Sequence, residues 1–416
     1  MSPSRRRVTR SGLAMACALL AAGAFCLPAS GEPGLRKAIS MSSINHGGDY
    51  EDLTAYGNLA TIGQTGARWV RIWVRWDKAQ LFPPSQLGWA SLGSTANDLP
   101  GCGTGCGFRY IQAIDAQIAA ARAAGLNVIL ANWHFPRWAN GTAGKPADWA
   151  RPDRGSASTT VERLKPMEYR VPVGQLGRTG YYGRWLDWLI ARYAGYGRNL
   201  ALEIMNEPNH QLWPQQAPST TSNPYAQGPV VISSYVAEML NTARAVSAAR
   251  GNPILLAGPG MADRFGANSR LMTNFQTAVP ESLSRLPPSG WSDNFIWSHH
   301  NYSDVERNIA SPTRAEQVRG YLLGRWRGRG GTGDPKVWLT EGGARLGQSQ
   351  ATTLALQAEL VRLNWERMTA APGIQMWTNY LLYANPVADS GLREDRLTSG
   401  IPRPVWSTFV AFPAKL

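Results

Sequence analysis

The sequence alternates short apolar runs with helical patterns eight times, and this alternation constrains the fold more than any other feature. The runs have the length and composition of buried strands. They span residues 37–43, 68–76, 127–132, 201–205, 253–257, 295–299, 336–340 and 374–377. Strands that alternate with helices pair in parallel, and eight such units favour an α/β fold, the closed (β/α)8 TIM barrel, over an open sheet.

The helical patterns between and after these runs complete the barrel units. They cover residues 49–64, 110–124, 182–193, 231–249, 268–278, 314–326, 351–368 and 405–412. No Gly-x-Gly-x-x-Gly follows the first strand, which argues against a dinucleotide-binding open sheet. The segments after strands two, three and four are long. Because loops after strands lie on the C-terminal face of a barrel, we expect a cleft on that face.

Residues 1–30 are predicted to be a secretory signal peptide. Four arginines precede an apolar stretch, residues 13–27, that is too short to span a bilayer. Small residues near Ser30 form a cleavage site, which leaves residues 31–416 as one barrel domain. We therefore expect a secreted protein with no transmembrane helix, and export by the general or the twin-arginine route both stay open.

Cysteine usage and net charge indicate in which compartment the protein folds and which classes of partner it can bind. Cys102 and Cys106 are the two cysteines that follow the signal, and in an oxidising compartment we expect a disulfide between them rather than free thiols. The net charge is +14, but arginine is scattered along the chain instead of clustering with aromatic residues. We therefore expect no nucleic-acid partner, whereas affinity for acidic glycans or an anionic cell envelope stays open.

Two predicted strands end in a glutamate. The fourth runs into Asn206 and Glu207 and is stopped by a proline, and the seventh runs into Glu341 and two glycines. Both glutamates would lie on the C-terminal face of the barrel, where this fold places its chemistry. Two carboxyl groups are the minimum for acid–base work on a glycosidic bond. Either glutamate alone would more often belong to a surface loop.

Strand parity predicts a buried positive charge close to these glutamates, because alternate residues of a barrel strand face the lumen. On the second strand the apolar face suits the helices, so Arg71 faces the lumen. A lumen arginine needs a carboxylate partner, for which Glu203 and Glu341 are both candidates. Glu203 lies deeper in its strand than Glu207, and we assign it to structure rather than catalysis.

Three more polar side chains are expected at strand tips on the same face. His300 and Tyr302 share one parity on the sixth strand, and His134 follows the third. A tyrosine hydroxyl close to a carboxylate can donate a hydrogen bond and keep it ionised. Each of these residues alone is more often structural, and it is their convergence on one face that favours a functional site.

Together these motifs resemble the retaining glycoside hydrolases of clan A, which share the (β/α)8 barrel, and most of all the cellulase-like family 5. The residues that carry the resemblance are Arg71, His134, Asn206, Glu207, His300, Tyr302, Glu341 and Trp377. The resemblance implies that Glu207 is the acid/base and Glu341 the nucleophile. Retention needs the two carboxyl groups roughly 5 Å apart, and two like charges that close push their pKa values apart.

The same resemblance implies roles for the other residues. Asn206 would bond to the sugar 2-hydroxyl, and Trp377 would form the floor of the −1 subsite. Arg71 and Tyr302 would hold the nucleophile, and the two histidines would bind substrate. The resemblance also implies a monomer that needs no metal and no cofactor and that acts on a β-linked oligo- or polysaccharide. The Trp-His-Phe-Pro-Arg-Trp segment after the third strand also resembles family 39, without the β-sandwich often attached there.

Other barrel proteins fit the sequence less well. A non-catalytic carbohydrate-binding barrel has no reason to keep both glutamates, whereas a transglycosidase would use the same residues and stays open. A Schiff-base aldolase needs a lysine at the C-terminal end of a strand, and Lys336 lies at an N-terminal end. A metal hydrolase needs ligands at chelating spacing, and the adjacent His299 and His300 point to opposite faces.

Tryptophan is abundant, with 17 residues, and its ring is suited to stacking on sugars. Those at or beyond strand ends fit a sugar platform and internal packing equally well: Trp73, Trp76, Trp133, Trp138 and Trp213. Those inside predicted elements are expected in the core: Trp69, Trp185, Trp188 and Trp365.

Overall fold

The computed structural model describes the chain between residues 35 and 413 with gaps. The described residues are 35–41, 53–55, 57–98, 107–140, 175–208, 229–263, 295–328, 330, 334–347, 351, 353–385, 389–395 and 398–413. They belong to one compact unit, Gly34–Leu416. The predicted signal peptide, both cysteines of the predicted disulfide, Trp213 and the predicted helix 268–278 lie outside them.

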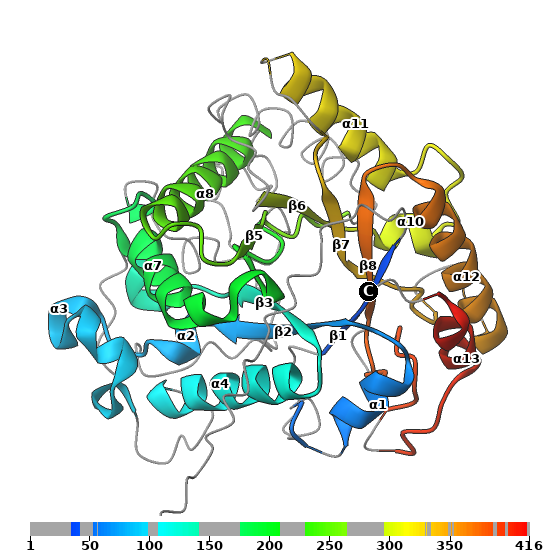
Figure 1. The fold of residues 1–416 in the computed structure, drawn as a ribbon, viewed down its shortest axis with the longest axis horizontal. Coiled ribbons are helices and arrows are strands. Elements are labelled where there is room, and N and C mark those ends of the chain that lie inside the picture. Colours follow the sequence, from blue (N-terminus) through cyan, green and yellow to red (C-terminus); the bar gives the residue numbers. More distant parts are fainter. Residues whose placement is uncertain are drawn as a thin grey trace, which may run out of the picture. The chain divides into compact units, whose positions relative to one another are not determined.

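Eight parallel strands close into a barrel in the order of the chain, which confirms the predicted TIM fold (Figure 1). The strands are β1 (Arg36–Ser40), β2 (Trp69–Arg75), β3 (Asn127–Trp133), β4 (Leu200–Glu203), β5 (Leu255–Ala257), β6 (Phe295–His300), β7 (Val337–Gly342) and β8 (Ile374–Tyr380). The last strand pairs with the first, in a register that sets Ser40 opposite Tyr380. This pairing leaves the sheet without an open edge.

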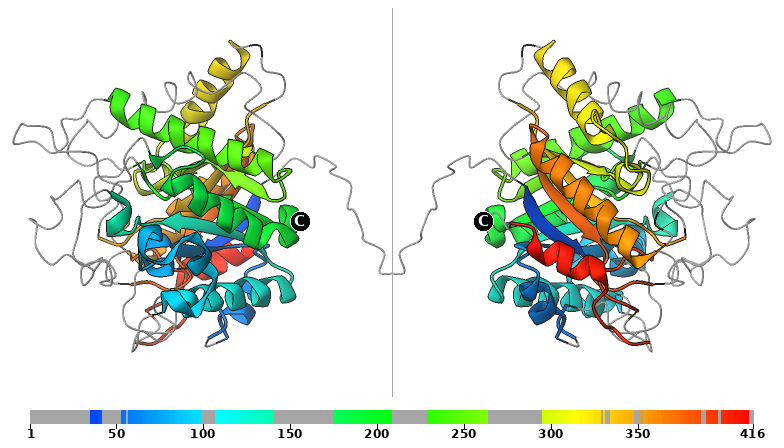
Figure 2. Two further views of the ribbon diagram at one scale, coloured as in Figure 1. Left: turned by 90° about the vertical axis from the view of Figure 1, so that its left-hand side faces the viewer. Right: turned by 90° about the vertical axis from the view of Figure 1, so that its right-hand side faces the viewer.

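Helices lie outside the strands in both side views (Figure 2). The longer ones are α1 (Asn58–Gln64), α4 (Gly107–Ala123), α7 (Tyr181–Tyr193), α8 (Pro229–Ala249), α11 (Arg314–Arg327), α12 (Leu354–Ala370) and α13 (Pro404–Ala411). Shorter ones are α2 (Trp76–Ala79), α3 (Pro84–Leu87), α10 (Tyr302–Glu306), η2 (Trp89–Gly93), η3 (Thr95–Asn97), η5 (Arg137–Asn140) and η8 (Ala194–Asn199). The first helix begins at Asn58 rather than at the predicted residue 49. Within the described ranges, no helix has the length and hydropathy to cross a membrane.

Two helices begin where the sequence supplies a capping side chain. Before α11, the Thr313 hydroxyl accepts from the amide of Glu316 at 3.3 Å, and the Glu316 carboxylate accepts from the amide of Thr313 at 2.6 Å. Before α12, the Thr353 hydroxyl accepts from the amide of Leu356 at 3.1 Å. Such caps satisfy amide groups that have no partner within the helix, and each stabilises it by about 1 kcal/mol.

The lumen of the barrel is filled by side chains in layers. The lower layer is apolar and takes one residue from each strand: Ala38, Trp69, Ile129, Ala201, Leu255, Ile296, Trp338 and Met376. The rings of Trp69 and Trp338 meet edge to face, with centroids 4.9 Å apart. This apolar layer closes the lumen below the C-terminal face, so polar groups above it rest on a packed floor.

The next layer toward the C-terminal face is polar. On six strands the residue two positions beyond the apolar layer is polar and fully buried, and on β3 and β5 it is an alanine. The polar members are Ser40, Arg71, Glu203, Ser298, Thr340 and Thr378. Period-two alternation explains the spacing, because residues two apart on a strand share a face. The predicted lumen position of Arg71 is therefore confirmed.

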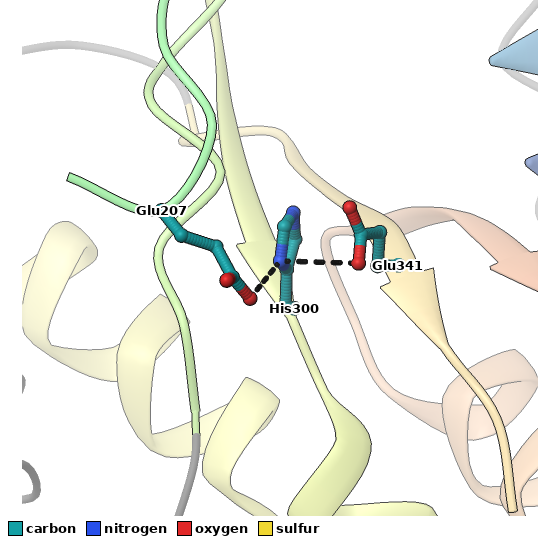
Figure 3. Close-up of side chains that lie close together, drawn as sticks. All are labelled: Glu207, His300 and Glu341. Carbon is teal, nitrogen blue, oxygen red and sulfur yellow. Dashed lines mark hydrogen bonds and ion pairs between the residues drawn. The ribbon is translucent and has the colours of Figure 1, made fainter. Parts of the chain in front are cut away.

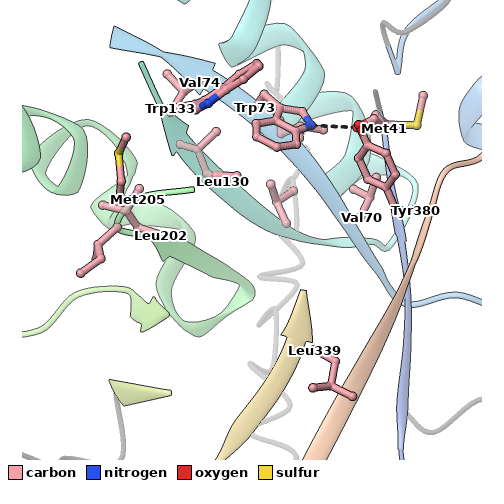
Figure 4. Close-up of a cluster of buried hydrophobic side chains, with 14 of the residues drawn as sticks. Met41, Val70, Trp73, Val74, Leu130, Trp133, Leu202, Met205, Leu339 and Tyr380 are labelled. Carbon is pink, nitrogen blue, oxygen red and sulfur yellow. Dashed lines mark hydrogen bonds between the residues drawn. The ribbon is translucent and has the colours of Figure 1, made fainter. Parts of the chain in front are cut away.

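The larger apolar core lies between the barrel and its helices. Figure 4 shows residues of this core from several strands, including Val70 and Val74 of β2, Leu130 of β3 and Leu202 of β4. The valines are the face of β2 that the sequence assigned to the helices. The barrel therefore has an outer core against helices and a separate inner one in the lumen.

The apolar layer gives a direct test of how the lumen is built. We expect Trp338→Ala to lower the free energy of unfolding by about 3–5 kcal/mol, because it removes a buried ring and leaves a cavity. Urea unfolding followed by far-ultraviolet circular dichroism measures the loss. The control is Tyr321→Ala on α11, where the side chain is 43% exposed, with an expected change within about 0.5 kcal/mol. Equal losses in the two variants would contradict a packed lumen.

Candidate active site

Glu207 and Glu341 meet at the C-terminal face, one just after β4 and the other on β7 (Figure 3). Both are nearly buried, with 9% and 5% of their surfaces exposed. A carboxylate oxygen of each glutamate and a ring nitrogen of His300 all lie within 4.8 Å of one another. At this separation the two carboxyl groups can reach the same bond of a bound ligand.

The backbone at Glu207 is held in an unusual conformation. Its φ angle is +44°, in the left-handed region, which costs a non-glycine residue about 1–3 kcal/mol. Its amide donates to the carbonyl of Gly260 at 2.8 Å, and the amide of Gly260 donates to the carbonyl of Met205 at 2.9 Å. This pairing beyond the end of β4 fixes the direction in which the Glu207 side chain leaves the strand.

Gly260 also leaves the room that two buried side chains require. A Cβ atom at this position would lie 2.5 Å from Nε2 of His300 and 2.8 Å from Oε1 of Glu203. Both distances are far below van der Waals contact, so any larger residue would displace the imidazole or the carboxylate. The glycine is therefore part of what places His300 between the two glutamates.

His300 bridges the glutamates from β6. Its Nδ1 lies 2.9 Å from Oε1 of Glu207 and 3.7 Å from Oε2 of Glu341 (Figure 3). Burial lowers the pKa of His300, but the carboxylates of Glu341 and Glu207 outweigh it and raise the pKa above its usual value. In contrast, burial lowers the pKa of His299 to about 3 and keeps it neutral. The bridging role of His300 was not apparent from the sequence.

Arg71 reaches the site from the polar layer of the lumen. Its Nη1 donates to Oε1 of Glu341 at 2.6 Å, and its Nη2 donates to Oε1 of Glu203 at 2.6 Å and to Oδ1 of Asn206 at 2.9 Å. Both carboxylates that the sequence offered as partners are therefore used. Burial lowers the pKa of Arg71, and the two carboxylates more than reverse this, so the guanidinium stays charged.

Tyr302, the first residue of α10, holds the other oxygen of Glu341. Its hydroxyl donates to Oε2 at 2.9 Å. Burial raises the pKa of Tyr302 well above its usual value, so the hydroxyl keeps its proton and remains a donor. Burial also raises the pKa of Glu341, and His300 and Arg71 offset only part of that effect. Each oxygen of Glu341 thus receives one hydrogen bond, as the predicted positions of Arg71 and Tyr302 imply.

The glutamates and His300 form the one set of three potential metal ligands among the described residues. The hydrogen-bond donors around these ligand atoms stabilise ionised carboxylates and disfavour a bound metal cation. Oε1 of Glu341 already accepts from the Arg71 guanidinium, which would repel a metal ion, and Oε2 accepts from Tyr302. Nδ1 of His300 already shares a hydrogen bond with Glu207.

The predicted role of Trp377 as the floor of a sugar subsite is wrong. The side chain is fully buried on the outside of the barrel, with its ring 6.2 Å from that of Trp365 on α12 and 6.0 Å from that of Phe409 on α13. The prediction ended the eighth strand at Trp377, whereas β8 continues to Tyr380. Since Met376 faces the lumen, its neighbour Trp377 faces the helices.

Tyr380 is the aromatic residue that does reach the site from β8. It shares the lumen parity of Met376, ends the strand and lies with its ring 6.0 Å from that of Tyr302. Extending the strand by three residues would have identified it from the sequence. Asn206 and His134 lie at the tips where they were expected. His134 also has a left-handed backbone, with φ +52°, and its ring lies 4.0 Å from that of Trp133.

Most of the tryptophans at strand ends pack against other aromatic rings. Trp76 stacks on Trp185 at 5.5 Å, and the edge of Trp138 meets Trp76 at 5.9 Å. Trp73 and Trp133 lie at the tips of β2 and β3 with their rings 4.9 Å apart. All four strand-end rings in the described ranges are buried, so packing is the role that their contacts support.

Comparison with known proteins gives a family match that covers most of the chain. The profile of the cellulases, glycosyl hydrolase family 5, matches residues 29–366. A search of curated proteins finds no match.

Several solved structures are similar at low sequence identity. An endoglucanase from Thermotoga maritima is 15% identical, with 90% of this chain and 96% of that chain covered and a TM-score of 0.47. A xyloglucan-specific endo-β-1,4-glucanase from a metagenomic library is 14% identical, with 91% and 96% covered and a TM-score of 0.49. An endo-β-1,4-glucanase from Xanthomonas axonopodis pv. citri is 13% identical, with 90% and 98% covered and a TM-score of 0.49.

The family match includes most of the segments that carry the site, but not β8 with Tyr380. It extends from before β1 to within α12, so it contains both Glu207 and Glu341. It also decides between the two families that the sequence motifs resemble, in favour of family 5. The chain belongs to the cellulase family, glycosyl hydrolase family 5.

Proposed function

We propose that this chain is a retaining β-glycoside hydrolase that cleaves a β-linked oligo- or polysaccharide by double displacement. The observation that carries the proposal is that one carboxylate oxygen of Glu207 and one of Glu341 lie within 4.8 Å of each other, while the two carboxylates have different hydrogen-bond partners. Retaining enzymes hold their carboxyl groups about 5–5.5 Å apart, whereas inverting enzymes need room for a water molecule between carboxylate and sugar.

The unlike surroundings assign the two roles. Glu341 accepts hydrogen bonds from Arg71 and Tyr302, two groups that stabilise its ionised form, so it is suited to attack the anomeric carbon. Glu207 accepts no bond from Arg71 in this arrangement and pairs with His300 instead. It is suited to carry the proton that the leaving oxygen needs.

The reaction then proceeds in two steps. In the first, Glu341 bonds to the anomeric carbon while Glu207 gives its proton to the departing oxygen, leaving a covalent glycosyl-enzyme. In the second, Glu207 takes a proton from water, whose oxygen displaces Glu341 from the same carbon. In this proposal Asn206, whose side-chain oxygen accepts from Arg71, bonds the sugar 2-hydroxyl, and Tyr380, whose ring lies 6.0 Å from that of Tyr302, contacts the sugar ring.

Two outcomes of the second step are open to such a site. Water gives hydrolysis, and a second sugar gives transglycosylation with the same residues. The family description makes β-1,4-glucans the first substrates to test, followed by other β-glycans. Sizing the products from a panel of β-glycans distinguishes hydrolysis, which only shortens chains, from transfer, which also lengthens them.

We also infer that the protein is exported and acts as a monomer outside the cell. Export is supported by the basic and apolar pattern of residues 1–30. It also fits the proposed function, because a polysaccharide substrate would not enter cells. Export would also favour the disulfide between Cys102 and Cys106.

Removing the nucleophile gives the first test. We expect Glu341→Ala to lower turnover of an aryl β-glycoside by roughly 10⁴-fold, because no covalent intermediate forms. Added azide fits the space left by the carboxylate and should restore part of the activity, with the α-glycosyl azide as product. In the control, Glu207→Ala with azide should give the β-glycosyl azide. Full activity of Glu341→Ala would remove this residue as the nucleophile.

The pH profile gives the second test. Glu341 must be ionised to attack, and burial raises its pKa, so kcat/KM should fall with decreasing pH at a value above the usual 4.5 of a glutamate. Tyr302→Phe removes a donor to the ionised form, which raises that pKa further. We therefore expect its acid limb at higher pH than that of the parent. An acid limb at or below 4.5, or one that Tyr302→Phe leaves unmoved, would contradict the assignment.

A pair of aromatic substitutions on β8 gives the third test. We expect Tyr380→Ala to lower kcat/KM about tenfold through lost contact with the sugar ring. Trp377→Ala should instead lower the free energy of unfolding by about 3–5 kcal/mol, as a core cavity would. Glycosidase assays and urea unfolding on both variants separate the effects. The reverse pattern would restore Trp377 to the subsite.

A further inference from the structure

A ring of side chains beneath the glutamates links four strands of the barrel. Arg71 joins Glu341 to Glu203, each at 2.6 Å. The other oxygen of Glu203 accepts from the Ser298 hydroxyl at 2.9 Å, and that hydroxyl lies 2.5 Å from the hydroxyl of Thr340. Thr340 precedes Glu341 on β7, so the backbone closes the ring.

Charge neutralisation of Arg71 does not require both carboxylates. Glu341 alone would balance one guanidinium, and burying Glu203 as well costs several kcal/mol that its contacts must offset. With two carboxylates on one guanidinium, each receives part of its positive charge. Glu203 therefore competes with Glu341 for Arg71.

We propose that Glu203 is a positioning residue that acts through Arg71 on the nucleophile, fixing the guanidinium and limiting the positive charge that Glu341 receives. Ser298 sets how strongly Glu203 competes, because its hydroxyl donates to the Glu203 oxygen that Arg71 does not use. This inference rests on the proposed function, since it assigns a second carboxylate to the tuning of the same nucleophile.

Competition for Arg71 shifts the pKa of Glu341 in one definite direction. Five charged or polar groups surround Glu341. They are Arg71 on β2, Glu203 on β4, Glu207 just after β4, His300 on β6 and Tyr302 on α10. In this set Arg71 and His300 lower the pKa of Glu341, whereas Glu207 and Glu203 raise it. Removing the charge of Glu203 should therefore make the nucleophile more acidic and less reactive.

Glu203→Gln is the direct test, because glutamine keeps the size of the side chain and removes its charge. We expect kcat/KM at pH 7 to fall roughly 10- to 100-fold and the acid limb of kcat/KM to move to lower pH. Asp187→Asn is the control: it removes a carboxylate from the exposed pair with Arg250 and should change neither quantity.

Ser298→Ala is the second variant, and its expected shift has the opposite sign. Glu203 loses one donor, holds Arg71 more strongly, and leaves Glu341 with less positive charge. We expect the acid limb to move to higher pH, and Ser298→Thr, which keeps a hydroxyl, to restore the parent profile. Urea unfolding on each variant corrects activity for the folded fraction, so loss of stability alone does not count as support.

The outcomes separate this inference from the proposed function. In the parent chain, labelling of Glu341 by a 2-deoxy-2-fluoro β-glycoside, located by mass spectrometry, tests the nucleophile itself. If Glu341 is labelled and the acid limbs of both variants match the parent limb, or move in the same direction, the positioning role of Glu203 is overturned and the hydrolase stands. If Glu341 is not labelled while another residue is, the proposed function falls first.

Discussion

The guanidinium of Arg71 is the group on which the rest of the site depends. It is fully buried and donates to Glu341, Glu203 and Asn206. An unpaired charge in the interior costs several kcal/mol, so the strands that carry these acceptors must keep their register for the barrel to be stable. The same requirement places Glu341 against a cation and Asn206 beside it. Fold stability and the electrostatics of Glu341 therefore rest on one set of contacts.

The layers of the lumen explain how the barrel supports such a charge. An apolar layer, with Trp69 against Trp338, closes the lower lumen, and the polar layer above it holds the buried ions. The C-terminal tips then carry groups in strained or crowded positions. Glu207 has a left-handed backbone held by Gly260, and that glycine has no space for a side chain beside His300. Strain at a site is tolerated where a packed scaffold holds it in place.

Much of the fold and part of the site follow from the sequence, because strand parity is a local property. Eight apolar runs predicted the barrel, and parity alone directed Arg71 inward toward Glu203. The same rule failed for Trp377, since nothing in Thr-Asn-Tyr marks the end of β8 and the predicted strand stops three residues too early. The bridge made by His300 and the backbone angle of Glu207 depend on packing against the segment after β5, which no periodicity encodes.

We propose that Glu207 and Glu341 cleave a β-glycoside with retention of configuration. Proton NMR of the anomeric signals, recorded in the first minutes of hydrolysis before mutarotation, measures this directly. If the two glutamates act in this way, the β-hemiacetal forms first and the α-anomer appears later by mutarotation. Initial release of the α-anomer would contradict it, because inversion requires a water between carboxylate and sugar, with carboxyl groups about 6.5–9.5 Å apart. One carboxylate oxygen of Glu207 and one of Glu341 lie within 4.8 Å of each other, which is short of the separation that inversion requires.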